Sequence, residues 1–333
     1  MTDAAAAIRD FQDTFRAARE EIGRVVVGHE EAVDAILTAF FAGGHVLIEG
    51  VPGTGKTLIV RSLAEAMGLS FGRVQFTVDL MPADVTGTRV IEELPDGRRD
   101  FRFVPGPIFA HVVLADEINR ATPKTQSALL EAMAEQQVTV AGVTHRLPAP
   151  FFVLATLNPI EMEGTYRQPE AQLDRFLFKV VLGYPSQAEL ERIIASTTSA
   201  AVPTIQPILA RETAAARVLE LQRLVREVLV GPQVERYAAA LVRLTLPGAG
   251  GDPDITRWVT YGASPRGGQA LLLGAKVQAL RDGRPHVAFE DVDRVARAAL
   301  RHRLVLGFAA ETAGVDASAL VDRVLAAAEP LRR

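Results

Sequence analysis

The chain has 333 residues, which is more than one compact core usually holds, so we expect two domains. Hydrophobic residues at 48% and charged residues at 23% are typical of a globular protein, and we find neither a signal-peptide pattern nor a membrane-spanning apolar run, so we expect a cytoplasmic location. The absence of cysteine excludes disulfides and thiolate metal sites, while a net charge of −4 without a basic tail argues against nucleic acid as the main partner.

The first part of the chain alternates helical patterns with short apolar runs. We expect helices over 4–22 and 30–41, and strands over 45–49, 73–77, 111–115, 150–156 and 177–182. Because strands and helices alternate, residues 1–185 predict an α/β core built on a parallel five-stranded sheet with helices on both faces. A ligand of such a sheet binds at the carboxyl ends of the strands.

From residue 186 the pattern becomes helical. After an irregular connection around 200–207, no convincing strand remains, and the expected helices cover 187–195, 213–229, 232–245, 265–280, 289–304 and 317–328. Residues 186–333 therefore predict a second, all-helical domain.

A phosphate-binding loop follows the first expected strand. Residues 50–57 match the pattern G-x-x-x-x-G-K-[ST] and precede a helical segment. The glycines let backbone N–H groups turn toward phosphates, Lys56 reaches the β- and γ-phosphates, and the Thr57 hydroxyl can ligate Mg²⁺. The predicted ligands are ATP and Mg²⁺, and the loop residues that bind them are Gly50, Val51, Pro52, Gly53, Thr54, Gly55, Lys56, Thr57 and the adjoining Leu58.

Polar residues also follow the third and fourth expected strands. Asp116 can hold Mg²⁺ through its water shell, and Glu117 can polarise the water that attacks the γ-phosphate. Asn158 can orient that water, although an Asn-Pro pair also favours a simple turn. The order of phosphate loop, Asp-Glu and Asn along successive strands favours ATP hydrolysis.

This order of motifs resembles that of the AAA+ ATPases. The longer segments around the motifs resemble the MoxR group of that family from about Val26 to Ala298. The segments that carry the resemblance are 44–50, 74–77, 79–87, 103–109, 116–121, 158–161, 170–176 and 262–266. The resemblance implies that the helical domain is a lid, that Asn158 is sensor 1 and that Arg266 is sensor 2. It also places adenine contacts at Gly28 and His29, for which a plain turn is the alternative.

The resemblance further implies that Arg175 is an arginine finger on a neighbouring subunit's nucleotide. A guanidinium supplied across an interface stabilises charge on the transferring phosphoryl group, so we expect a homo-oligomer, in this family a hexameric ring. Arg175 could instead pair with Asp174 or Glu170, with Arg167 or, more weakly, Arg120 as the finger. Whether Arg266 acts on its own or the neighbour's nucleotide stays open.

Two further segments, 88–103 and 137–147, predict β-hairpins that resemble inserts of this family. We expect them to contact a substrate or partner, with simple decoration of the sheet as the alternative.

The resemblance implies a MoxR-type ATPase that remodels, matures or activates protein complexes or metalloenzymes, often beside proteins with von Willebrand factor A domains. The alternative is an ATPase that remodels nucleic acid. The acidic pI of about 5.9 argues against this alternative. A nucleotide-dependent switch with negligible turnover is a third possibility, against which Asp116, Glu117 and Asn158 argue.

Overall fold

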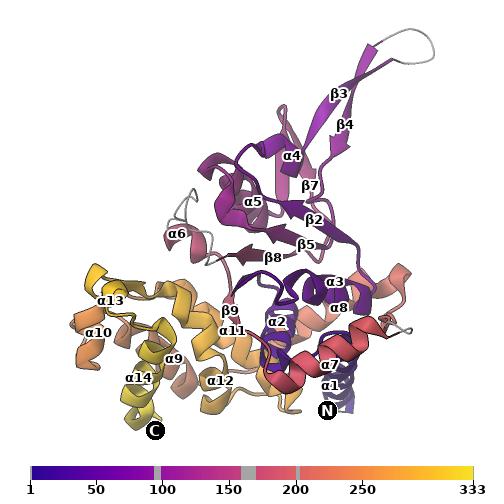
Figure 1. Ribbon diagram of the computed structural model, residues 1–333. Helices are drawn as coiled ribbons and strands as arrows, with labels where there is room; N and C mark the ends of the chain where they lie inside the picture. Colours follow the sequence, from indigo (N-terminus) through magenta and orange to yellow (C-terminus); the bar gives the residue numbers. More distant parts are fainter. Residues whose placement is uncertain (1, 94–98, 159–169, 200–202, 333) are drawn as a thin grey trace.

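The computed structural model describes residues 2–93, 99–158, 170–199 and 203–332, and Figure 1 shows their arrangement. A five-stranded parallel sheet lies in the first part of the chain. Its strands are β1 (Val46–Gly50), β2 (Phe71–Gln75), β5 (Val112–Asp116), β8 (Phe152–Leu157) and β9 (Phe178–Leu182). They are ordered β2-β5-β8-β1-β9, and every neighbouring pair is parallel. All five predicted strands are present, although β2 begins two residues earlier than expected.

The three central strands are covered on both faces, as their continuous apolar sequences require. Alternate residues contribute to two apolar clusters: Ile48 and Leu114 belong to one, and Leu47 and Val113 to the other. The helices around the sheet are α1 (Thr2–Gly23), α2 (Glu30–Ala42), α3 (Lys56–Ala66), α4 (Pro82–Thr86), η1 (Ile118–Arg120), α5 (Pro123–Glu135) and α6 (Glu170–Leu173). The first cluster includes residues of α1, α2 and α3, and the second includes residues of α5, which confirms the predicted core with helices on both faces.

The carboxyl ends of the central strands meet at one edge because the strands run parallel. The register places Val46 of β1 beside Leu154 of β8, and Leu114 of β5 beside the same residue. The phosphate loop therefore follows β1 at the same edge where Glu117 follows β5 and Asn158 follows β8.

The rest of the chain is mainly helical. Its elements are α7 (Gln187–Thr198), α8 (Arg211–Glu227), α9 (Pro232–Leu244), α10 (Pro253–Trp258), α11 (Pro265–Arg281), α12 (Phe289–Leu300), η2 (Arg301–Arg303), α13 (Phe308–Thr312), α14 (Ala317–Ala328) and η3 (Glu329–Leu331). The expectation of an all-helical unit missed one short antiparallel pair, β10 (Val259–Tyr261) with β11 (Val305–Leu306). Strands of three and two residues are too short to show a period in the sequence.

The helical part packs closely on the sheet layer. Helices α8 and α11 contact α2, and α12 contacts β9. One apolar cluster runs from Ile8 to Ala328 through both parts. At Gly274 of α11, an added Cβ would lie 2.6 Å from Cζ of Phe178 in β9, so only glycine permits this approach. The domain boundary at residue 185 stays a prediction.

Both predicted hairpins are present. Strands β3 (Gly87–Glu93) and β4 (Arg99–Pro105) pair antiparallel and project from the body of the molecule (Figure 1), with their turn at 94–98 outside the described residues. Strands β6 (Gln137–Val140) and β7 (Val143–Arg146) are joined by Ala141 and Gly142, which both have positive φ, as in the tight turns of two-residue hairpins. Within the described ranges, no helix is both long and apolar enough to cross a membrane.

Candidate nucleotide site

The phosphate loop turns tightly between β1 and α3. Gly53 and Gly55 have φ values of 82° and 81°, in the left-handed region that favours glycine. The Thr54 hydroxyl donates a hydrogen bond of 2.9 Å to the carbonyl of Val51, which closes the turn. Because α3 begins at Lys56, its first backbone N–H groups lack helical partners and can bind an anion.

Lys56 folds back over this loop. Its Nζ donates to the carbonyl oxygens of Gly50 at 2.7 Å and Val51 at 2.8 Å. Burial lowers the pKa of the Lys56 ammonium below its usual range, while the Asp116 and Glu117 carboxylates oppose the shift. The lysine thus lies between the phosphate loop and both acidic residues of the predicted site.

Asp116 is held by the strands on either side of β5. Its side chain is largely buried, and the residue is 8% exposed. Oδ1 accepts a hydrogen bond of 2.6 Å from the Thr156 hydroxyl of β8, and Oδ2 accepts one of 2.8 Å from Arg73 of β2. Both contacts fix the orientation of the carboxylate.

Glu117 adopts a left-handed conformation, with φ of 56°, which is uncommon outside glycine. Its N–H donates to the Thr156 hydroxyl at 2.8 Å. Its Oε2 accepts hydrogen bonds from Gln75 at 2.9 Å and from Arg120 at 2.8 Å. The backbone turn and these side chains together fix the carboxylate beside Asp116.

Three polar residues of this site were not predicted from the sequence. Thr156, Arg73 and Gln75 lie on β8 and β2, the two strands beside β5. In the sequence, the only indication of their role is that they are polar residues near the carboxyl ends of expected strands. It becomes informative once the strand order is known, which the sequence pattern does not supply.

A cavity of about 410 Å³ joins the loop to the ends of β5 and β8. Nine residues line it: Pro52, Gly53, Gly55, Lys56, Thr57, Leu58, Asp116, Glu117 and Asn158. Asn158 is only 3% exposed. The structure therefore brings most of the predicted loop, both carboxylates and the amide to one cavity, while Gly50, Val51 and Thr54 of the loop are not part of its lining.

Gly28 and His29 lie elsewhere, at the N-terminus of α2. Both have positive φ, and an added Cβ on Gly28 would lie 2.7 Å from Oε1 of Glu189 in α7. Neither residue lines the 410 Å³ cavity. Their contact with adenine stays a prediction.

Arg175 and Arg266 line a different cavity of about 330 Å³. Arg175 donates a hydrogen bond of 2.8 Å to the carbonyl of Leu130, and Arg266 lies 3.6 Å from Asp174. Asp174 forms its shorter ion pair, of 2.8 Å, with Arg303 rather than with Arg175. The alternative finger Arg167 lies outside the described residues, and Arg120 bonds to Glu117 in the nucleotide cavity.

The oxygen atoms at this site suit magnesium. The Thr57 hydroxyl and the Asp116 carboxylate line the same cavity and are hard ligands of the kind that Mg²⁺ prefers. In the part of the chain that is described, no group of three or more histidine or acidic residues could hold a metal unaided. Phosphate and water would supply the remaining ligands, as is usual for Mg²⁺ with nucleotides.

Two family models match the chain. Residues 45–178 match the "ATPase family associated with various cellular activities (AAA)", and residues 255–324 match the AAA lid domain. The first match contains strands β1, β2, β5 and β8 and the residues that line the 410 Å³ cavity, and the second begins inside α10 and extends into α14.

Relatives match over nearly the whole chain. The protein is 44% identical to YeaC of Bacillus subtilis over 94% of both chains. It is 42% identical to Chaperone MoxR1 of Mycobacterium tuberculosis, over 92% of this chain and 79% of that protein. Protein MoxR of Methylorubrum extorquens is 33% identical over 90% of each.

A solved structure shows the same fold. It is that of a candidate ATPase from Cytophaga hutchinsonii, with a TM-score of 0.88 and 36% identity over 98% of this chain and 97% of that one. Together with the cavity that gathers the phosphate loop, Asp116, Glu117 and Asn158, these likenesses lead to one conclusion. The chain belongs to the MoxR family of AAA+ ATPases.

Proposed function

We propose that the protein binds ATP with Mg²⁺ in the 410 Å³ cavity and hydrolyses it to ADP and phosphate. The observation that carries this proposal is the convergence of Lys56, Asp116, Glu117 and Asn158 on one cavity at the carboxyl edge of the sheet. The magnesium ion would neutralise phosphate charge when bound to Thr57 and Asp116. Lys56 would exchange its two carbonyl acceptors for phosphate oxygens.

Glu117 is assigned to water activation. Its carboxylate is fixed by Gln75 and Arg120, and it faces the cavity that Asn158 also lines. A carboxylate there can accept a proton from the attacking water, while the Asn158 amide orients that water.

The site is proposed to be completed by a second subunit. Arg175 and Arg266 line a cavity that shares no residue with the cavity at the phosphate loop, which supports a role for them at another subunit's nucleotide. An arginine at an exposed position can instead reach the nucleotide of a neighbour and stabilise transition-state charge. We therefore propose a homo-oligomeric ring, hexameric as the family implies.

We propose that ATP hydrolysis drives the chaperone-like remodelling, maturation or activation of a protein client, such as a complex or a metalloenzyme. A relative named as a chaperone supports this. The projecting β3–β4 hairpin carries apolar side chains suited to contact with another protein, since Ile91 is 63% exposed and Phe101 57%. A von Willebrand factor A domain protein is the partner that the family suggests.

The first test is Glu117→Gln. We expect it to lower the ATPase rate by about 10²- to 10⁴-fold, the usual contribution of a general base, while ATP binding measured by calorimetry is retained. Glu131→Gln is the matched control, because Glu131 lies exposed on α5 outside the cavity. A Glu117→Gln protein that hydrolyses ATP at the wild-type rate would overturn the assignment.

A further inference from the structure

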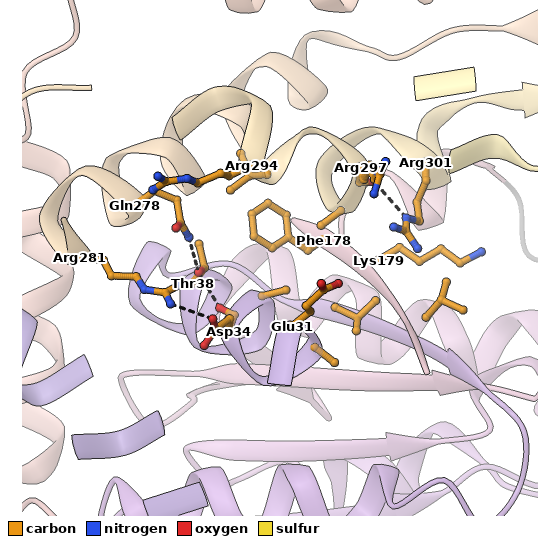
Figure 2. Close-up of a pocket in the computed structure, with 16 residues that line it drawn as sticks. Glu31, Asp34, Thr38, Phe178, Lys179, Gln278, Arg281, Arg294, Arg297 and Arg301 are labelled. Atoms are coloured by element: carbon orange, nitrogen blue, oxygen red, sulfur yellow. Dashed lines mark hydrogen bonds and ion pairs between the residues drawn. The ribbon is translucent and has the colours of Figure 1, made fainter. Parts of the chain in front are cut away.

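Another cavity of about 440 Å³ lies between the sheet layer and the lid helices. Its walls come from α2, β9, α11, α12 and η2, and it shares no residue with the nucleotide cavity. Figure 2 shows its lining, with Phe178 near the middle and charged side chains around it. A cavity of this size is within the usual range for small-molecule sites.

Basic side chains dominate the charged part of the lining. They are Lys179, Arg281, Arg294, Arg297 and Arg301. Four of the five are neutralised by carboxylates. The pairs are Lys179 with Glu49 at 2.6 Å, Arg281 with Asp34 at 2.9 Å, Arg294 with Asp282 at 2.6 Å and Arg297 with Asp322 at 2.6 Å.

Arg301 is the exception. Its Nε donates a hydrogen bond of 3.1 Å to the carbonyl of Arg297. Among the residues that the structure describes, no carboxylate pairs with its guanidinium and no acceptor binds its terminal nitrogens. Burial lowers the pKa of Arg301, the Asp316 carboxylate opposes this shift, and the neighbouring Arg297 lowers the pKa further. Because arginine stays charged, a half-buried guanidinium without a directly bound carboxylate is costly.

The acidic residues of the lining do not meet this need. Asp34 already accepts hydrogen bonds from Arg19 at 2.6 Å and from Arg281 at 2.9 Å. Glu31 lies on α2 and acts on Arg297 instead, whose pKa is raised by Asp322 first and also by Glu31. In Figure 2, Arg297 and Arg301 lie together on the side of Lys179, while Arg281 and Asp34 occupy the opposite end.

We propose that this cavity binds a small ligand bearing a phosphate group, with the Arg301 guanidinium as its principal contact. The planar fork of arginine matches phosphate oxygens in pairs. Arg297 and Lys179 add positive charge on the same side, and the apolar wall at Phe178 can hold the remainder of the ligand. The ligand would touch both β9 and α12, and so both parts of the chain.

Calorimetric titration with inorganic pyrophosphate, orthophosphate and ADP tests this proposal. The protein is first given the Lys56→Ala substitution, which weakens phosphate binding in the nucleotide cavity. We expect saturable binding of at least one probe, weakened about tenfold or more by Arg301→Gln, as loss of charge-assisted hydrogen bonds predicts. Arg301→Lys should restore part of the affinity. The control is Arg323→Gln, which should bind like its parent, because Arg323 pairs with Asp254 at 3.0 Å and lines neither cavity.

The three probes separate a free phosphate ligand from a nucleotide. Preference for ADP over pyrophosphate indicates a nucleotide, and equal affinity indicates a site for the phosphate group alone. Absence of saturable binding to all three probes, or equal affinity in Arg301→Gln and Arg323→Gln, would reject the site. Melting temperatures establish that each variant is folded. If Lys56→Ala does not fold, Arg301→Gln and Arg323→Gln are compared in the otherwise wild-type chain. The outcome is independent of ATP hydrolysis, which uses the other cavity.

Discussion

Asp174 ties the lid to the sheet layer beside Arg175. Its Oδ1 accepts a hydrogen bond of 2.8 Å from Arg303, and its Oδ2 accepts one of 2.8 Å from the Ser264 hydroxyl. The Arg303 side chain is 2% exposed and also donates to the carbonyl of Phe176 at 2.8 Å. Burial lowers the pKa of Arg303, and Asp174 opposes this shift. The pair thus holds a buried charge in place.

Asp174→Asn should therefore destabilise the protein strongly. The change leaves Arg303 buried without its counterion, and the loss of one partner of a buried pair costs about 3 kcal/mol or more. Urea unfolding measures the loss. The control is Asp13→Asn, because Asp13 pairs with Arg16 on an exposed part of α1 and such pairs contribute less than about 1 kcal/mol. Similar losses in both variants would show that Asp174 does not support Arg303.

His45 is a buried neutral side chain at the start of β1. Its Nδ1 accepts a hydrogen bond of 3.1 Å from the N–H of Val153, and its Nε2 lies 3.3 Å from the carbonyl oxygen of Met133. Burial lowers the pKa of His45 to about 4. The histidine pKa in the unfolded chain is about 6.5. Between about pH 4 and pH 6.5, the unfolded chain therefore binds a proton that the folded protein does not bind.

Stability should consequently fall as the pH drops from about 6.5 to about 4, by up to about 3 kcal/mol from His45 alone. The variant His45→Gln keeps an acceptor and a donor but has no proton to gain. Urea unfolding at pH 7.5 and pH 5 should show a smaller loss in the variant by about 2 kcal/mol. An equal loss in both proteins would assign the acid sensitivity to other groups, including buried His302, whose pKa is also lowered.

At the scale of elements, the sequence predicts well what is local and long. The apolar runs of β1, β5 and β8 are continuous because both faces of these strands are buried. Short elements were not predicted. Strands β10 and β11 have only three and two residues. The helix that was expected to reach residue 304 ends at Leu300, where η2 follows it. Helix α5 was also missed, although Pro123 marks its first turn.

The candidate site divides in the same way. The phosphate loop and the Asp-Glu pair are contiguous in the sequence, so their pattern is visible without a structure. Arg73 and Thr156 contact Asp116 from separate strands, and only the order of β2, β5 and β8 brings them there. The position of Arg301 in the 440 Å³ cavity likewise depends on packing between η2 and β9.

The β3–β4 hairpin is the proposed site of client contact because it exposes apolar side chains. Ile91 and Phe101 face each other across its two strands, and Arg89 lies over the Phe101 ring at 4.8 Å. The double change Ile91→Ser and Phe101→Ser should leave folding and basal ATPase unchanged, because both side chains are exposed and distant in sequence from the site. It should reduce stimulation of hydrolysis by a client or a client-derived peptide.

Phe308→Ser is the control for this prediction, since Phe308 is another exposed aromatic side chain but lies in the lid. Client-stimulated ATPase and client binding are measured for both proteins. Unchanged stimulation in the hairpin variant would mean that the hairpin only decorates the sheet.

At the scale of the whole molecule, the lid and the sheet layer share one apolar core, so Arg266 stays beside Arg175. Close packing of Gly274 on Phe178 opposes a rotation that would carry Arg266 toward its own phosphate loop. We therefore expect both arginines to act on the same nucleotide, that of a neighbouring subunit.

Mixing inactive variants tests this arrangement directly. Glu117→Gln subunits keep Arg175, and Arg175→Ala subunits keep an intact nucleotide cavity. If sites are shared, each variant alone should be nearly inactive, but mixed oligomers should regain part of the ATPase activity, because some interfaces combine an intact cavity with an intact arginine. Mixing Glu117→Gln with Lys56→Ala is the control and should restore nothing, since both defects lie in the cavity. The wild-type rate per subunit should also rise with protein concentration as oligomers form. Mixed oligomers that form, as judged by native mass measurement, yet stay inactive would show that Arg175 does not complete a neighbour's site.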